Sequence, residues 1–238
     1  MHSTTAIATP WRWVCKMISI RCLIFDAEAS NVALQEALQP VLQQLPDEAE
    51  VRLLLNDKDS EVAAAYQQCA KPPLPKACVC LDNLEESQAL ALKTELEALF
   101  TGATATIFDT RLVLRPNWQI GQRTPGTVQL CTFKQKQDIS REEFIAIWRD
   151  SHTQVAIDTQ STFGYFQNLA LEGQNIGFDA LVEEHFPIEA AASPEAFFDA
   201  VDDPAKLRQN IDCMMESCAR FIQQDTINVI HLSEYKIK

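Results

Sequence analysis

The order of elements along the chain restricts its fold more than any other feature, because one plan occurs twice. In the first half, apolar runs and amphipathic stretches predict the order strand, helix, strand, strand, helix, strand. The predicted elements cover 18–26, 30–45, 50–57, 76–83, 85–100 and 103–116. A further short helix is expected around 60–70, and Pro40 should kink the first long helix. This split β-α-β order is typical of ferredoxin-like folds.

The second half repeats the order. Strands are predicted over 127–136, 163–171, 179–188 and 226–237. Ser140 and Glu143 form a capping box that should open a helix ending near Thr159. Ser193 before a proline predicts a short helix, and Asp203 before a proline predicts a longer one through residue 222. The plan therefore recurs with little identity between its two copies.

We accordingly predict an α+β chain of two tandem ferredoxin-like repeats. The repeats cover 18–116 and 126–238, the polar stretch 117–125 links them, and 1–17 forms an N-terminal arm. Each four-stranded sheet would have one face covered by helices and one bare apolar face. Two bare faces can close into an eight-stranded α/β barrel with space for one small ligand, either within a single chain or in a homodimer.

Charge and composition exclude several classes of partner. The formal net charge is −13, and each half carries more acids than bases, so neither nucleic acid nor an anionic membrane is expected to bind. No apolar run approaches the roughly 20 residues needed to span a bilayer. No glycine-rich phosphate loop is visible, and we expect no cofactor.

The eight cysteines favour free thiols in a reducing cytoplasm. None forms a C-x-x-C pair, and several lie in apolar runs such as "KACVCLDN", where cysteine behaves as a small buried hydrophobe. No secretory signal precedes them. We therefore predict a cytoplasmic protein without disulfides or zinc.

His152 is the main catalytic candidate. It follows Phe144 and Trp148 at four-residue spacings and precedes Val155 by three, so all four share one helix face. One interpretation is a general base or acid in a dry pocket, held in one tautomer by Glu184 or Tyr235. The other is a histidine at a helix end, held by a backbone carbonyl. Spacing alone leaves both open.

Five further residues are candidates for substrate binding, each with a structural alternative. Trp148 could be a platform or core packing, and Tyr165 and Tyr235 could bond an oxygenated substrate or any buried partner. In "LVEEHF", alternation places residue 183 with His185 on one face and Glu184 on the other. Because a charge facing the interior is costly, one of these glutamates should meet a cation or a histidine. A metal site is not expected from such scattered residues.

The second half also resembles a known family. "FKQKQDISREEFIAIWRDSH" is similar to the opening of EthD-domain proteins, and the similarity continues through "YFQN" at 165–168, "DALVEEHF" at 179–186 and "LSEYKI" in the last strand. The resemblance covers roughly 126–238. It implies the dimeric α/β barrel type of fold, a pocket inside the sheet, and small hydrophobic or aromatic substrates. Family members accompany ether-degrading oxidation or act on polyketide-like aromatics.

The chain departs from the family pattern around the expected pocket. "HTQV" stands at 152–155 where the family usually has "HAPL", and Leu169 stands where a second histidine is common. The last strand carries Glu234 and Tyr235 in place of a common "EEH", while His185 occupies a position usually held by tryptophan. One polar pattern has been exchanged for another.

Three functions remain open from the sequence. The first is an enzyme, an oxidoreductase or a lyase or cyclase, that acts on a small apolar or aromatic substrate by proton transfer or oxygenation. The second is a non-catalytic binding protein for a hydrophobic metabolite. The third is a structural relic whose interior is filled by its own side chains. An empty, lined pocket would count against the third, and the surroundings of His152 would separate the first two.

Overall fold

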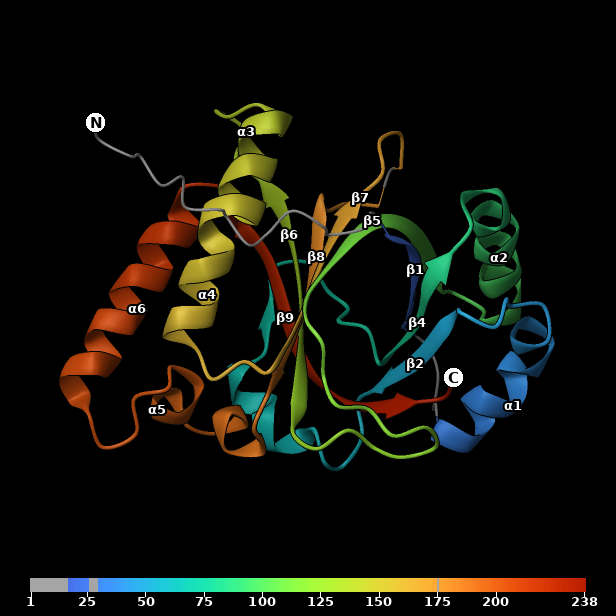
Figure 1. Ribbon diagram of the computed structural model, residues 1–238, viewed down its shortest axis with the longest axis horizontal. Coiled ribbons are helices and arrows are strands. Elements are labelled where there is room, and N and C mark those ends of the chain that lie inside the picture. Colours follow the sequence, from blue (N-terminus) through green and yellow to red (C-terminus); the bar gives the residue numbers. More distant parts are fainter. Residues whose placement is uncertain (1–16, 26–29, 175) are drawn as a thin grey trace, which may run out of the picture.

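The computed structural model describes residues 17–25, 30–174 and 176–238, so almost all of the predicted arm lies outside the described residues. The protein is a mixed α+β fold with one large antiparallel sheet (Figure 1). Its strands are β1 Met17–Ile24, β2 Glu50–Leu55, β3 Gln68–Cys69, β4 Ala77–Leu84, β5 Thr104–Leu114, β6 Thr127–Gln135, β7 Gly164–Ala170, β8 Ala180–Phe186 and β9 Ile222–Lys236. Its main helices are α1 Asn31–Leu42, α2 Glu86–Leu99, α3 Arg141–Ala146, α4 Thr153–Thr159, α5 Pro194–Phe197 and α6 Pro204–Ala219.

The strands are hydrogen-bonded in the order β2-β4-β1-β5-β7-β8-β6-β9-β3, and β2 also pairs with β9. That last pairing joins Arg52 to Lys236 and Leu55 to Ser233, so the pairings of eight strands return to their starting strand. Within each half the order is the same: second strand, third, first, fourth. The halves meet along three strand pairs, β5 with β7, β2 with β9, and the short β3 with β9.

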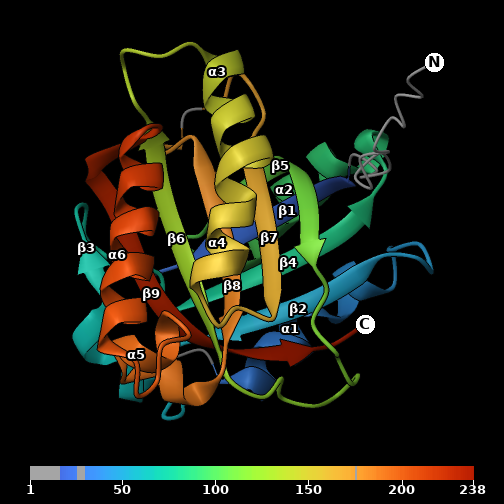
Figure 2. The same ribbon diagram turned by 60° about the vertical axis from the view of Figure 1, so that its left-hand side comes forward.

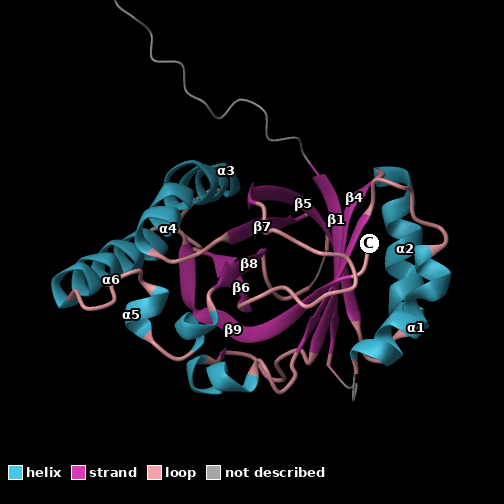
Figure 3. Cartoon of the chain, turned by 60° about the horizontal axis from the view of Figure 1, so that its bottom comes forward, coloured by secondary structure: helices cyan, strands magenta, loops and turns pink. Residues whose placement is uncertain are grey.

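Two helix layers flank the strands. Helices α1 and α2 cover the strands of the first half, while α3, α4 and α6 cover those of the second (Figures 1 and 2). Seen from below, the strands lie between the two layers (Figure 3). Each strand therefore has one side chain row toward its helices and one row toward the space between the two sets of strands.

The helices begin where the capping residues predicted. Ser140 Oγ accepts a hydrogen bond from the Glu143 amide at 3.1 Å, and Asp203 accepts one from Lys206 at 3.0 Å. Such caps satisfy amides that have no partner within the helix. Helix α1 forms as the sequence predicted and contains Pro40 inside its last turn. The predicted helix over 140–159 forms as α3, a π-helical segment η2 (Ile147–His152) and α4.

Two predicted elements differ from the structure. Around 60–70 the chain forms a 3-10 helix, η1 (Glu61–Tyr66), followed by the two-residue strand β3, which pairs with β9. Helix α6 ends at Ala219 rather than at Ile222, where β9 already begins. Phe221 is fully buried beneath the helices of the second half, so the chain must leave the helix before it to continue into the sheet.

Cysteines and membrane segments can be assessed for most of the chain. Seven of the eight cysteines are described and all are free, which confirms the prediction for those seven; Cys15 lies outside the described residues. No helix in the described part of the chain is both long and apolar enough to cross a bilayer.

Candidate functional site

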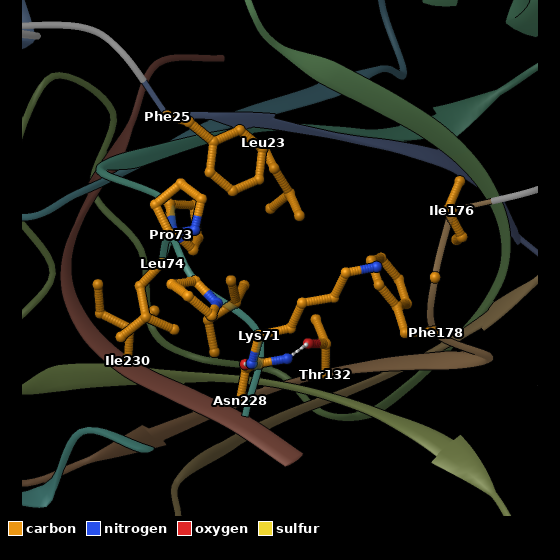
Figure 4. Close-up of a pocket in the computed structure, with 14 residues that line it drawn as sticks. Leu23, Phe25, Lys71, Pro73, Leu74, Thr132, Ile176, Phe178, Asn228 and Ile230 are labelled. Atoms are coloured by element: carbon orange, nitrogen blue, oxygen red, sulfur yellow. Dashed lines mark hydrogen bonds between the residues drawn. The ribbon is translucent and has the colours of Figure 1, made fainter. Parts of the chain in front are cut away.

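A pocket of about 190 Å³ opens at one end of the space between the two sets of strands (Figure 4). Four chain segments surround it: strand β1 and the residue after it, the proline-rich segment 71–75, the loop before β8, and the interior row of β6 and β9. Most of its walls are apolar, namely Leu23, Phe25, Pro72, Pro73, Leu74, Pro75, Leu130, Ile176, Phe178 and Ile230. An engineered apolar cavity of roughly 150 Å³ binds benzene, so this pocket has space for about one aromatic ring.

Three polar side chains line the same pocket. Asn228 Nδ2 donates to Thr132 Oγ1 at 3.3 Å, the bond drawn in Figure 4. Asn228 Oδ1 accepts the backbone amide of Lys71 at 2.9 Å. The Lys71 side chain is exposed and extends toward the loop before β8, where its Nζ lies 3.5 Å from the position a Cβ would take on Gly177. A few convergent polar groups among apolar walls are typical of small-molecule sites.

A buried charge cluster occupies the interior away from this mouth, and consists of Arg21, Arg52, Asp82, Glu183 and Glu234. Arg52 Nη1 lies 2.7 Å from Glu183 Oε2 and 2.8 Å from Glu234 Oε1, and Arg52 Nη2 lies 2.9 Å from Asp82 Oδ2. Arg21 pairs with Asp82 at 2.8 Å and with Glu183 through its Nε. The prediction that one glutamate of "VEEH" meets a cation is confirmed by Glu183.

Mutual pairing keeps this cluster ionised despite its burial. Burial alone would raise the pKa of Glu183 and of Asp82, but the two guanidinium groups outweigh it and hold both pKa values below their usual range. The pKa of Arg21 is raised, because the attraction of Asp82 and Glu183 exceeds the opposing effect of burial. Its charges are mostly paired with one another, although Arg21 Nη2 has no hydrogen-bond partner among the described residues. None of the members of the cluster lines the pocket.

His185 lies beside the cluster on the interior row of β8. Its Nε2 is 3.0 Å from Glu234 Oε2, an ion-pair distance, although the angle is not that of a hydrogen bond. Burial would raise the pKa of Glu234, but His185 and Arg52 lower it far below its usual range. The ring of His185 lies against Gly164, which is its cross-strand partner on β7. A Cβ added to Gly164 would fall 2.6 Å from His185 Nδ1. Glycine at this strand start therefore leaves space for the imidazole.

His152 lies in the other layer, between the helices and the second-half strands. Its Nδ1 is 2.9 Å from Ser217 Oγ on α6, and its ring packs edge-on against Phe221. Burial, reinforced by the charge of Arg220, lowers its pKa to about 4, so the ring is neutral near pH 7. The side chain that orients the ring is Ser217, whereas the sequence suggested Glu184 or Tyr235. His152 lines none of the pockets that the structure describes.

The predicted binding residues fall into different layers. Trp148, Tyr165 and Glu184 are buried on the helix-covered side with His152, where Trp148 stacks edge-on with Phe133. Burial raises the pKa of Glu184 to about 7, and raises that of Tyr165. His185 faces the interior, on the opposite side of β8 from Glu184, as alternation predicted. The structure therefore separates these residues from the pocket.

Tyr235 lies apart from both groups. Its hydroxyl donates to Asp57 Oδ2 at 2.9 Å, and burial together with Asp57 raises its pKa to about 12. The contact joins the last strand to the loop after β2, that is, the second half to the first. Tyr235 does not line the pocket.

Sequence reasoning missed the interior arginines and Lys71. Arg21 and Arg52 each stand as the single charge within an apolar strand, in "ISIRCLIF" and "VRLLL". A lone cation in a run that must be buried needs an anion, so this pattern could have predicted the cluster. Lys71 gave no such signal, because a lysine beside two prolines is typical of any exposed loop. Within the described ranges, no group of three or more His, Cys, Asp or Glu side chains is placed to hold a metal ion.

Similarity to solved structures is at the level of the fold. An anthrone oxidase-like protein superimposes with a TM-score of 0.52 at 8% identity, over 93% of this chain and 93% of that one. A dye-decolorizing peroxidase from Bacteroides thetaiotaomicron gives a TM-score of 0.45 at 8% identity, over 90% and 92% of the two chains. No curated protein matches the sequence. The first of these likenesses supports the α+β fold.

The second half carries a family match of its own, which confirms the resemblance found in the sequence. The matched segment begins at the end of β6, includes η2 with His152, and ends within β9. Residues 136–225 match the EthD domain family.

Proposed function

We propose that this protein binds a small, mainly apolar molecule in the pocket between Leu23, Leu130 and Ile230, within a single-chain version of the dimeric α/β barrel. The equal strand order of the two halves and the closing β2–β9 pair support two tandem ferredoxin-like units over 18–116 and 126–238. In such an arrangement the space between the two sets of strands is the natural ligand site. The observation that carries the proposal is the lined pocket itself.

The position of the pocket favours ligand binding over a purely structural role for the interior. The interior is otherwise filled by the charge cluster and by apolar side chains, so the opening at one end is a specific departure from dense packing. A protein whose interior served only assembly would have no reason to keep this opening. The size of the pocket favours a ligand of about one aromatic ring over an extended one.

A second candidate is an enzyme of the EthD type that carries out oxidative chemistry on such a molecule. The match over 136–225 favours it. The placement of His152, bonded to Ser217 in the helix layer, gives no support to proton transfer by this residue at the pocket. Any catalytic group would have to come from the polar side chains at the mouth.

Ligand-observed NMR with one-ring probes such as phenol and toluene tests the binding proposal on the full chain. The variant Leu74→Trp places a large side chain in a half-buried pocket wall and should abolish probe binding. Leu90→Trp makes the same change on the exposed face of α2, with Leu90 67% exposed, and should leave binding intact. Binding that survives Leu74→Trp unchanged would overturn the proposal. Mass spectrometry of the same mixtures would reveal conversion of a probe, and conversion that Leu74→Trp removes would favour the enzyme.

A further inference from the structure

We propose that the ligand of this pocket is an anion, a small aromatic or branched carboxylate whose apolar body lies inside and whose charged group meets Lys71. This inference rests on the proposed function, since it concerns the same pocket. It adds the charge of the ligand and the residue that selects it.

The first support is the charge of the pocket wall. The chain has 33 acidic and 20 basic residues, yet the fourteen residues that line this pocket include one lysine and no aspartate or glutamate. The only charged side chain among the residues that line the pocket is therefore a cation, although the chain as a whole has a large negative excess. An anion approaching elsewhere meets repulsion, and at this mouth it meets a cation.

The second support is that the backbone of Lys71 is held in place. Strand β3 pairs with β9 at Cys69 and Asn228, and the Ala70 amide donates to the Ile227 carbonyl at 3.3 Å. The Lys71 amide then donates to Asn228 Oδ1 at 2.9 Å. These attachments hold the backbone at Lys71 beside the pocket, so the side chain starts from a fixed position at the mouth.

The third support is the availability of the ammonium group. Among the described residues, no carboxylate lies within ion-pair distance of Lys71, whereas the two interior arginines, Arg21 and Arg52, are both paired. The side chain extends across the mouth toward Gly177 and Phe178 (Figure 4). A carboxylate on a ring seated among Leu23, Leu130 and Ile230 would meet this group at the opening. Thr132 Oγ1 could donate a second hydrogen bond to it.

The experiment compares three probes with the same ring and different charge, benzoate, benzamide and benzylamine, titrated into the full chain by calorimetry or NMR at low ionic strength. Benzoate should bind up to about fivefold more tightly than benzamide, and benzylamine should be the weakest, because an ammonium-carboxylate contact at a partly exposed mouth is worth at most a factor of about this size. Added salt should reduce the preference for benzoate.

The variant Lys71→Gln should lower benzoate affinity to that of benzamide and leave benzamide affinity unchanged. Lys76→Gln is the matched control, because Lys76 is an exposed lysine in the same segment that does not line the pocket. If benzamide binds as well as benzoate in the native protein, or if Lys71→Gln leaves the preference intact, the inference is overturned while the binding site stands. If none of the probes binds and Leu74→Trp changes nothing, the proposed function itself fails.

Discussion

The two halves of the chain share one strand order but fill the layer beneath their helices with different side chains. In the first half that layer is almost wholly aliphatic, with Phe100 as the aromatic member of its buried cluster. In the second half the cluster contains five aromatic side chains: Phe133, Phe144, Trp148, Tyr165 and Phe221. The strand plan therefore does not dictate the chemistry of the core, and only the aromatic layer buries His152 and Glu184.

Each helix-covered layer belongs to one half, but the interior between the halves is built from both, and neither half is complete there alone. The first half supplies Arg21 and Arg52 with one acid, Asp82, and the second supplies Glu183 and Glu234. Each side would bury an unbalanced charge without the other. The pairing across the interface thus makes each half depend on the other for the balance of its buried charge.

The largest expected effect comes from breaking this pairing. Arg52→Met leaves three buried carboxylates short of their shared cation and should lower the free energy of unfolding by about 3–5 kcal/mol, measured by urea denaturation. Arg115→Met makes the same change at an exposed pair with Glu50, whose arginine side chain is 53% exposed, and should cost about 1 kcal/mol or less. Equal losses in the two variants would show that the interior cluster does not hold the halves together.

The aromatic layer should give the second half a pH dependence that the first lacks. His152 has a folded pKa of about 4 against 6.5, so the unfolded chain binds the proton first and stability falls as pH drops from 6.5 toward 4. Glu184 has a folded pKa of about 7 against 4.5, so the folded chain keeps its proton longer and stability falls as pH rises from 4.5 toward 7.

Two variants separate these opposite contributions. His152→Gln should flatten the acid side of the stability curve, and Glu184→Gln should gain stability over the native chain as pH rises, each by up to about 3 kcal/mol. Urea denaturation at several pH values gives the curves. In the first half the corresponding buried layer is apolar apart from Cys22, and burial raises the pKa of this thiol to about 12. Cys22→Ala is therefore the control variant, which should not change how stability depends on pH between about 4 and 7. A native curve that neither glutamine variant alters would remove this contrast between the halves.

A smaller effect is expected where His185 meets glycine. In Gly164→Ala the new Cβ would fall 2.5 Å from Pro116 Cγ and 2.6 Å from His185 Nδ1, so the ring or the strand must shift, at a cost of about 1–3 kcal/mol. Thermal unfolding measures the loss. The double variant Gly164→Ala with His185→Ala removes one of the two contacts and should lose less than the sum of its single changes. Strict additivity would show that the alanine does not press on the ring.

The smallest effect distinguishes a contact between the halves from one within a half. Arg149 on η2 lies 3.1 Å from Asp109 on β5, with side chains 16% and 19% exposed, so this pair joins second half to first. Lys93 and Glu97 form a pair within α2 at 2.7 Å. Double-mutant cycles should give a coupling energy of about 1 kcal/mol for the first pair and about 0.3–0.5 kcal/mol for the second. The reverse order would indicate that partial burial does not strengthen the joint between the halves.

Much of the architecture could be predicted from local patterns. Periodicity and residue type act over a few neighbouring positions. They are sufficient to predict the order of strands and helices along the chain, the caps at Ser140 and Asp203, and the opposite faces of Glu183 and Glu184. The EthD resemblance likewise depends on a continuous stretch of the second half. These features can be predicted without knowing which distant residues pack against them.

The site was decided by contacts between distant positions. Arg52 and Glu183 are 131 positions apart, and His152 is 65 positions from Ser217, so no local pattern says which partner each will have. The sequence by itself determined that His152 lies on an apolar helix face and that one glutamate of "VEEH" needs a cation or a histidine. Only the tertiary structure decided that the histidine lies in the helix layer, that the cation is Arg52 together with Arg21, and that the opening belongs to Lys71 and the proline segment. The physical reason is that periodicity sets the face a side chain occupies, whereas the packing of segments that are distant in the sequence selects what that face meets.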